Sequence, residues 1–223
     1  MRLDCTFQKI FLLNLRRRPD RLEAAQAELS RVGVYAEVVH SIDAKEEPDT
    51  LPGLYNSPGS SALARTVLNL IERASAERIA SFLLLEDDVV FHADFQAKLE
   101  ALTLPADWEA FYLGCQHVEP PESVAPGIVR VMKGYDTHAL GLSAQMYPAV
   151  VDVLNRKYHF GACESDVRIS FLQPFRRMYA ALPNLTWQRV ATSDIRQRTY
   201  SNYDARGNQR WNRHNVKGFS ENE

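Results

Sequence analysis

Apolar residues along this chain fall into two patterns, continuous runs of strand length and longer runs with helical spacing. Continuous runs are typical of strands buried on both faces of a sheet. They occupy residues 8–15, 35–39, 81–91 and 110–114. Between them, apolar residues recur with a period of 3.6 from Leu22 to Leu29 and from Leu63 to Ala74, which predicts two amphipathic helices. Alternation of strands with helices favours an α/β fold with a mostly parallel central sheet flanked by helices.

The second half of the chain predicts shorter and less regular elements. Two stretches rich in proline are expected to be long loops, at 42–61 and 116–127. Strands are predicted at 129–133, 138–143 and 178–182, the first two paired with each other across Gly134–Tyr135, and helices at 94–102 and 148–157. Pro19 begins the first helix and Gly33 ends it.

Three acids interrupt the run at 81–91, where Leu85 is followed by Glu86, Asp87 and Asp88. If the strand continues, alternation places Glu86 and Asp88 on one side, about 6–7 Å apart, and Asp87 on the other. Burying three carboxylates is unfavourable unless a positive group binds them. We therefore expect a cation here, and oxygen ligands favour Mg²⁺ or Mn²⁺ over zinc. The alternative is an ordinary acidic exit from a strand.

A basic turn follows the first strand, with Asn14 and Leu15 leading into Arg16, Arg17 and Arg18, and with Arg21 one helical turn further on. Positive groups between the end of a strand and the start of a helix are suited to bind an anion such as phosphate. The alternative is a solvated basic turn. No Gly-rich fingerprint follows the strand, which argues against a Rossmann dinucleotide site. Ligands of such sheets bind at the carboxyl ends of strands, where both the arginines and the acids fall.

Composition narrows the picture further. The 223 residues predict one main domain, and the net charge of −2 gives no reason to expect nucleic-acid binding. Three cysteines without a C-x-x-C pair predict neither a disulfide framework nor a zinc site, and they fit the reducing cytoplasm. The apolar runs are too short for a membrane span, and the first residues do not resemble a signal peptide.

The order of these pieces resembles glycosyltransferase family 25, the lipopolysaccharide glycosyltransferases. The matching segments are 11–22 (FLLNLRRRPDRL), 83–89 (LLLEDDV), 110–114 (AFYLG), 138–143 (HALGLS) and 193–195 (SDI). Each is weak alone, but together they extend over most of residues 8–195 in the family's order. The resemblance implies a GT-A type nucleotide-sugar fold, a UDP-hexose donor such as UDP-galactose, Mn²⁺ or Mg²⁺, and an inverting transfer. The implied acceptor is a glycan of lipooligosaccharide or another surface polysaccharide, or a lipid-linked saccharide.

The family comparison, with the chemistry above, assigns expected roles to individual residues. Asp88 and Glu86 are expected to hold the metal. Asp166, preceded by Glu164, is the candidate general base for the acceptor hydroxyl; the alternative is that this pair caps a helix. His138 is a candidate metal ligand or substrate contact, and the alternative is an inward-facing strand histidine bonded to the backbone. The expected donor-binding residues are Asn14, Leu15, Arg16, Arg18, Arg21, Glu86, Asp87 and His138.

One segment departs from the family pattern. The family carries Gly-Cys-x-x-Ser-His before the acidic strand, and residues 59–66 here read GSSALART, without the Cys or the His. A changed substrate or reduced activity would follow, so a non-catalytic nucleotide-sugar or glycan-binding relative is one alternative function. A Mg²⁺-dependent phosphotransfer enzyme is another, although a first strand that ends in Asn14 lacks the nucleophilic aspartate of one such class.

We expect residues 1–195 to form the glycosyltransferase domain and 196–223 a basic, aromatic tail. Such a tail could close over the donor, contact an anionic membrane surface or remain solvated. These features predict a cytoplasmic protein, peripheral to the inner face of the membrane.

Overall fold

A computed structural model describes residues 1–48, 50–189, 191–192 and 199–200. An eight-stranded sheet forms its centre, in the order β2-β1-β3-β10-β5-β11-β8-β7. These strands are β1 (Lys9–Asn14), β2 (Glu37–His40), β3 (Ser81–Glu86), β5 (Ala110–Tyr112), β7 (Glu122–Ala125), β8 (Ile128–Arg130), β10 (Ala139–Ser143) and β11 (Met178–Ala181). Six of the eight run in one direction, and β8 and β10 run against them.

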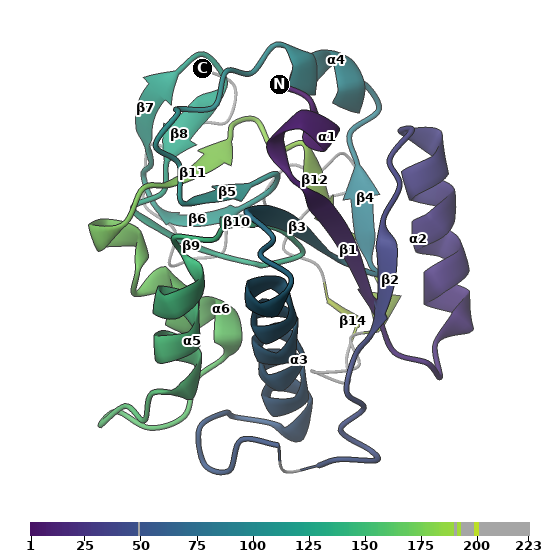
Figure 1. The fold of residues 1–223 in the computed structure, drawn as a ribbon, viewed down its shortest axis with the longest axis vertical. Helices are drawn as coiled ribbons and strands as arrows, with labels where there is room; N and C mark the ends of the chain where they lie inside the picture. The colour runs from purple at the N-terminus through teal and green to yellow at the C-terminus, as the bar shows by residue number, and fades with distance from the viewer. Residues whose placement is uncertain (49, 190, 193–198, 201–223) are drawn as a thin grey trace.

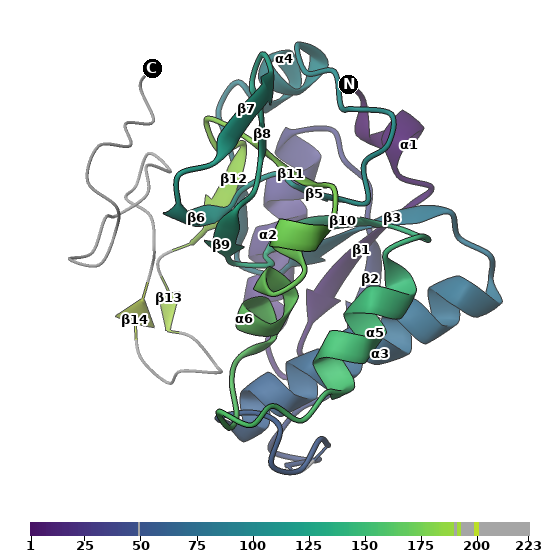
Figure 2. The same cartoon turned by 90° about the vertical axis from the view of Figure 1, so that its left-hand side faces the viewer.

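Helices cover both faces of this sheet (Figures 1 and 2). The helices are α1 (Leu3–Thr6), α2 (Pro19–Arg31), α3 (Pro58–Ala76), α4 (Phe95–Glu100), α5 (Tyr147–Asn155), α6 (Ser165–Ser170) and the 3₁₀ turn η1 (Gln173–Phe175). The predicted fold class is therefore confirmed as far as the α/β class and a mostly parallel central sheet flanked by helices.

The alternation of apolar residues along β1 and β3 divides the core in two. Phe11 and Phe82 pack with α3, α5 and α6 on one face. Leu12 and Leu85 pack with α2 and α4 on the other face. Because successive strand side chains point to opposite faces, the polar residues directly after each strand also point alternately to one face and to the other. This decides which helix each residue at the carboxyl edge meets.

The helix predicted from Leu22 to Leu29 is α2, and it begins and ends where its sequence signals indicate. Pro19 occupies the first position of α2, where a missing N–H costs nothing, and Gly33 takes a positive φ of 66° just beyond the end of the helix. The helix predicted from Leu63 to Ala74 is α3. It begins earlier than predicted, at Pro58, inside the predicted loop 42–61. The Ser57 side chain caps it by accepting a hydrogen bond from the Ser60 N–H.

Two other predictions for the second half are wrong. The predicted loop 116–127 contains two strands, β6 (Gln116–Glu119) and β7. The predicted hairpin across Gly134–Tyr135 does not form, because β10 inserts between β3 and β5. Instead, β8 pairs with β7 and β11, and β9 (Lys133–Tyr135) pairs with β6. Burial between β3 and β5 decides the place of β10, whereas local spacing suggested pairing with the strand nearest in the sequence.

The acidic run also differs from the prediction of one continuous strand. β3 ends at Glu86, Asp87 and Asp88 form a turn, and β4 (Val89–Phe91) leaves the central sheet. β4 pairs with β12 (Thr186–Gln188), almost a hundred residues further along the chain. The acids therefore lie where the backbone passes from one sheet to another.

The predicted tail 196–223 lies outside the described residues, apart from Thr199 and Tyr200, which form β14 and pair with β13 (Ala191–Thr192). The family-like segment 193–195 also lies outside them. Among the helices that the structure describes, none combines the length and apolar character that crossing a bilayer requires.

Candidate functional site

The basic turn and the acidic turn meet at the carboxyl edge of the sheet. Strands β1 and β3 are parallel neighbours with Leu13 opposite Glu86, so the residues that follow each strand emerge side by side. Asn14 is buried there, and its Nδ2 donates to Asp87 Oδ2 at 2.7 Å and to the Arg18 carbonyl at 3.0 Å. One amide thus joins the start of the basic turn to the second acid.

Arg21 supplies the positive charge at this junction. It lies in the first turn of α2, and its Nη2 is 2.7 Å from Asp87 Oδ1 and 2.9 Å from Asp88 Oδ2. Asp87 meets α2 because its side chain points to the face that α2 covers, as alternation along β3 requires. Contrary to prediction, Asp88 does not follow Glu86 along a continuing strand: β3 has ended, and the turn brings Asp88 Oδ2 to Arg21, although the charge of Asp88 still raises the pKa of Glu86.

The rest of the basic turn is more open to solvent. Arg16 is exposed and Leu15 is half-buried, its carbonyl accepting a hydrogen bond from the Arg18 N–H at 2.8 Å. Arg18 pairs with Asp20 at 2.8 Å, and Arg17 pairs with Asp43 at 2.5 Å. Ion pairs at an exposed surface are readily exchanged for others. The exposed Arg16 and the Arg18–Asp20 pair, in which Asp20 is exposed, are therefore open to an approaching anion, whereas Arg17 is held by the mostly buried Asp43.

Glu86 points to the opposite face, toward the segment that precedes β10. Its carboxylate accepts a hydrogen bond from the Thr137 hydroxyl at 3.0 Å, and its N–H donates to the His138 carbonyl at 2.9 Å. Burial, and then the charge of Asp88, raise the pKa of Glu86 to about 8. Burial raises the pKa of Asp87 to about 6, although Arg21 opposes the shift, and it also raises the pKa of Asp88. Burial thus favours the protonated form of each acid, and Arg21 opposes the shift in all three.

The acids fit a hard divalent cation in one respect, since Oδ1 of Asp88 is buried and accepts no hydrogen bond. Within the described part of the chain, no three His, Cys, Asp or Glu side chains are grouped to enclose a metal. Magnesium, however, is commonly held by one or two carboxylates together with phosphates of the substrate. Asp88 and Glu86 therefore provide the oxygen donors that such an ion uses.

The candidate bases lie at the start of α6. Glu164 accepts a hydrogen bond from the Ser60 hydroxyl, in the first turn of α3. Asp166 Oδ1 accepts from the Val167 N–H at 2.8 Å, and its Oδ2 lies 3.4 Å from the Asp136 N–H. Asp166 is half-buried, and its two oxygens contact backbone N–H groups. Glu164 instead accepts its hydrogen bond from a side-chain hydroxyl. The segment that departs from the family pattern thus contacts Glu164 through Ser60.

Two residues that the sequence did not single out connect the bases to the acids. Asp136 is buried with a positive φ of 74°, a conformation that Asp tolerates better than most residues. Its N–H faces Asp166, and the next residue, Thr137, binds Glu86. The only sequence signal was an Asp directly after a Gly-Tyr pair between two apolar runs, which is typical of a turn.

His138 lies in the core. Its ring is fully buried, with Nε2 3.1 Å from the Thr186 hydroxyl, and burial lowers its pKa to about 4. Gly114 leaves room for the ring, since a Cβ there would approach Nε2 to 2.9 Å. This placement favours the inward-facing interpretation, with Thr186 of β12 as a partner of the ring.

Comparison with known proteins found curated relatives but no matching family model. The chain is 29% identical over 161 residues to "Inactive glycosyltransferase 25 family member 3" of Homo sapiens, covering 61% of this chain and 27% of the relative. It is 26% identical over 164 residues to "Procollagen galactosyltransferase 2" of Mus musculus, covering 63% and 26%. The match therefore spans about a quarter of the length of these relatives.

Solved structures give more distant likenesses. A glycosyltransferase involved in glycosylation of the major capsid of PBCV-1 aligns with a TM-score of 0.39 and 14% identity, over 66% of each chain. A Drosophila β1,4-galactosyltransferase 7 mutant, in complex with manganese, UDP-Gal and xylobiose, aligns with a TM-score of 0.45 and 12% identity, over 82% of this chain and 70% of that one.

Proposed function

We propose, from the sequence relationship of this chain to members of the glycosyltransferase 25 family, that it transfers a hexose from a UDP-sugar to a glycan acceptor. The observation that carries the proposal is the junction of Asn14 and Arg21 with Asp87 and Asp88. It places a basic turn and an acidic turn at one edge of the sheet, where a diphosphate and its cation need opposite charges side by side. The names of the related procollagen galactosyltransferases support galactose as the hexose.

The residues divide the work of such a reaction. Arg16, Arg18 and the start of α2 would bind the diphosphate, since guanidinium groups and helix N-termini both suit phosphate. Asp88 and Glu86 would hold Mn²⁺ or Mg²⁺, which as a Lewis acid stabilises charge on the departing UDP. Asn14 and Arg21 orient the acidic turn by holding Asp87 and Asp88.

Asp166 is the proposed base. The acceptor hydroxyl must lose its proton as it attacks the anomeric carbon, and inversion requires the base on the face opposite the departing UDP. The Asp136–Thr137 segment forms one hydrogen bond with Asp166 and one with Glu86. The same two residues therefore help to position both the proposed base and a proposed metal ligand. Glu164 is held by Ser60 at the start of α3, and we assign it a positioning role.

A second candidate function is a non-catalytic relative that binds a nucleotide sugar or glycan. Two observations favour it: several curated relatives are named as inactive, and Ser60 stands in the segment where the family pattern has cysteine. Such a protein would keep the donor-binding junction without turnover. A Mg²⁺-dependent phosphotransfer enzyme has no comparable support.

The remaining parts of the proposal concern the setting of the reaction. We propose as acceptor a lipooligosaccharide or another surface polysaccharide, or a lipid-linked saccharide, at the inner face of the cytoplasmic membrane. The basic residues beyond Arg189 would make the peripheral contact.

A donor screen tests the proposal. UDP release is measured from UDP-galactose and UDP-glucose with a glycan acceptor, with Mn²⁺ and again with EDTA. Release that needs both acceptor and Mn²⁺ is expected from the transferase. Stabilisation by UDP and Mn²⁺ without any release would favour the non-catalytic relative, and absence of both would reject the two readings together.

A further inference from the structure

A stack of aromatic rings lies in the loop between α5 and α6. The rings of Tyr158 and Phe160 are nearly parallel, at 17°, with centroids 5.0 Å apart. Phe171 braces both through edge contacts, at 5.1 Å from Tyr158 and 5.7 Å from Phe160. His159 adds a further edge contact to Phe160 at 5.4 Å. The Phe160 ring is thereby held by one nearly parallel ring and two nearly perpendicular rings.

Arg168 anchors this stack to the protein interior. It is fully buried, and its guanidinium carbon lies 5.1 Å from the Tyr158 ring centroid and 4.4 Å from that of Tyr55. The guanidinium also donates to backbone carbonyls near the end of α5 and in the adjoining loops. These belong to Val153 (3.2 Å), Arg156 (2.6 Å), Cys163 (3.2 Å) and Leu54.

These contacts have a clear physical origin. The last carbonyls of a helix lack hydrogen-bond donors within the helix and carry partial negative charge. A buried cation at the end of α5 supplies the missing donors and neutralises that charge. The planar guanidinium can bind several carbonyls while it also lies over aromatic rings, which lysine could not do as well. Tyr55, Arg168, Tyr158 and Phe160 thus form one layered unit, called here the aromatic stack.

The outermost layer of the aromatic stack faces solvent. Phe160 is 55% exposed although its ring is held in place. The turn that carries it is closed by a hydrogen bond from the Gly161 N–H to the Tyr158 carbonyl at 3.2 Å, and Gly161 has a φ of +99° that favours glycine. A ring that is both fixed and exposed offers a flat apolar face at little entropic cost to a ligand.

The position of the aromatic stack connects it to the proposed chemistry. Arg168 lies on α6, its N–H donates to the Glu164 carbonyl at 3.0 Å, and Asp166 is two residues away. Leu54 accepts hydrogen bonds from Arg168 and from the Cys163 N–H, so the loop before α3 lies against the same unit. Figures 1 and 2 show the loop between α5 and α6 running beside the loop that leads into α3.

We propose that the exposed face of Phe160 is an acceptor subsite, on which a pyranose ring of the glycan acceptor stacks. This deepens the proposed function and rests on it. A pyranose has an apolar C–H face surrounded by hydroxyls, and Phe160 is flanked by the exposed polar residues Lys157 and His159. The helix that anchors the stack also carries the proposed base, which connects this face to the acceptor side of the proposed reaction.

Direct binding tests this subsite without relying on turnover. Methyl β-galactopyranoside, methyl β-glucopyranoside and methyl β-N-acetylglucosaminide are titrated by saturation-transfer NMR, with and without UDP and Mn²⁺. We expect binding of at least one glycoside to the wild type and about tenfold weaker binding to Phe160→Ala. Phe160→Trp should retain binding, because the indole also offers a flat face.

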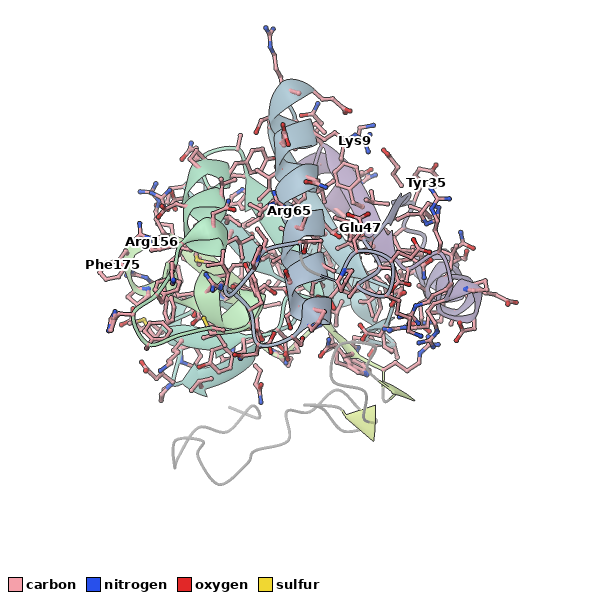
Figure 3. All side chains as sticks on the ribbon, turned by 90° about the horizontal axis from the view of Figure 1, so that it is seen from below. Lys9, Tyr35, Glu47, Arg65, Arg156 and Phe175 are labelled. Carbon is pink, nitrogen blue, oxygen red and sulfur yellow. The ribbon has the colours of Figure 1, made fainter. Side chains whose placement is uncertain are left out.

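Phe175→Ala is the matched control. Phe175 is 83% exposed, and Figure 3 shows it on the same side of the molecule as Arg156, yet it is not one of the stacked rings. The glycoside affinity should not change in this variant. Stabilisation by UDP and Mn²⁺ should be unchanged in both variants, which separates this subsite from the donor site.

Several results would overturn the proposal. They are equal binding by Phe160→Ala and the wild type, equal losses in Phe160→Ala and Phe175→Ala, and no glycoside binding by a wild type that UDP and Mn²⁺ stabilise. A protein dimer or an association with phospholipid vesicles that disappears in Phe160→Ala would reassign the exposed face to those partners. Failure of UDP to stabilise the wild type would instead count against the proposed function.

Discussion

The side-chain amide of Asn14 donates a hydrogen bond to the Asp87 carboxylate across the carboxyl ends of two parallel strands, at 2.7 Å. Both residues are buried, so neither group can exchange its partner for water without rearrangement. The contact ties the basic turn after β1 to the acidic turn after β3. It makes these two turns, which lie 73 residues apart in the sequence, one structural unit.

Replacing Asn14 tests this unit. Asn14→Leu removes the donor and leaves the Asp87 carboxylate poorly solvated, so we expect the free energy of unfolding to fall by about 1–3 kcal/mol. Asn14→Asp should cost more at pH 8 than at pH 5, because it places two carboxylates together. Urea denaturation at both pH values measures the effect, with Glu23→Ala, an exposed position of α2, as the control. An Asn14→Asp penalty that does not depend on pH would contradict the assignment.

Glu86 should make stability depend on pH. Its folded-state pKa of about 8 lies above the unfolded value, so the folded protein holds a proton that the unfolded chain releases. The unfolded state is then favoured progressively as pH rises from about 4.5 to 8, and stability falls over that window. Glu86→Gln should flatten this decline and exceed the wild type at pH 8 by on the order of 2 kcal/mol. Denaturation between pH 5 and 8.5 in EDTA tests it; equal slopes in both proteins would refute it.

Asp88 should be needed for the cation. Mn²⁺ added to UDP should raise the melting temperature of the wild type beyond the effect of UDP alone, since ligands that bind only the folded state stabilise it. In Asp88→Ala the increment from Mn²⁺ should disappear, while EDTA should abolish it in the wild type. Asp94→Ala, which removes an exposed carboxylate near α4, should behave like the wild type. A full Mn²⁺ increment in Asp88→Ala would place the cation elsewhere.

Asp166 and Glu164 should differ in their effect on turnover. Asp166→Asn removes the proposed base, so kcat should fall by about 10²–10⁴-fold while UDP affinity is retained. Glu164→Gln keeps an oxygen that can accept the Ser60 hydrogen bond, so its effect should be much smaller. UDP-release kinetics and thermal shifts with UDP measure the two quantities. Asp152→Asn, an exposed position on α5, serves as control, and the reverse order of effects would make Glu164 the base.

Local patterns were sufficient for the strands and the helix that carry the basic and acidic turns. The sequence alone shows the continuous apolar runs of β1 and β3. It also shows the Pro19 and Gly33 signals that bound α2. Alternation then correctly sends Asp87 and Glu86 to opposite faces of the sheet. These features depend on neighbours within a few residues, which is the range that periodicity reports.

Local sequence patterns gave the wrong pairing where a strand pairs with a strand far away in the sequence. The strand through Asp88 is broken because β4 finds its partner in β12, and β10 leaves its neighbour β8 for a place between β3 and β5. The roles of Asp136, Ser60 and Arg168 were likewise invisible, since each acts through a contact between elements far apart along the chain.

The amino-acid sequence by itself therefore determined the α/β class, the family resemblance and the meeting of a basic and an acidic turn at the edge of the sheet. The tertiary structure decided the rest. It placed Asp88 on Arg21, linked Asp166 to Glu86 through Asp136 and Thr137, and buried Arg168 within the aromatic stack. The reason is that local spacing specifies which way a side chain points, whereas the group that it meets depends on how all the elements pack together.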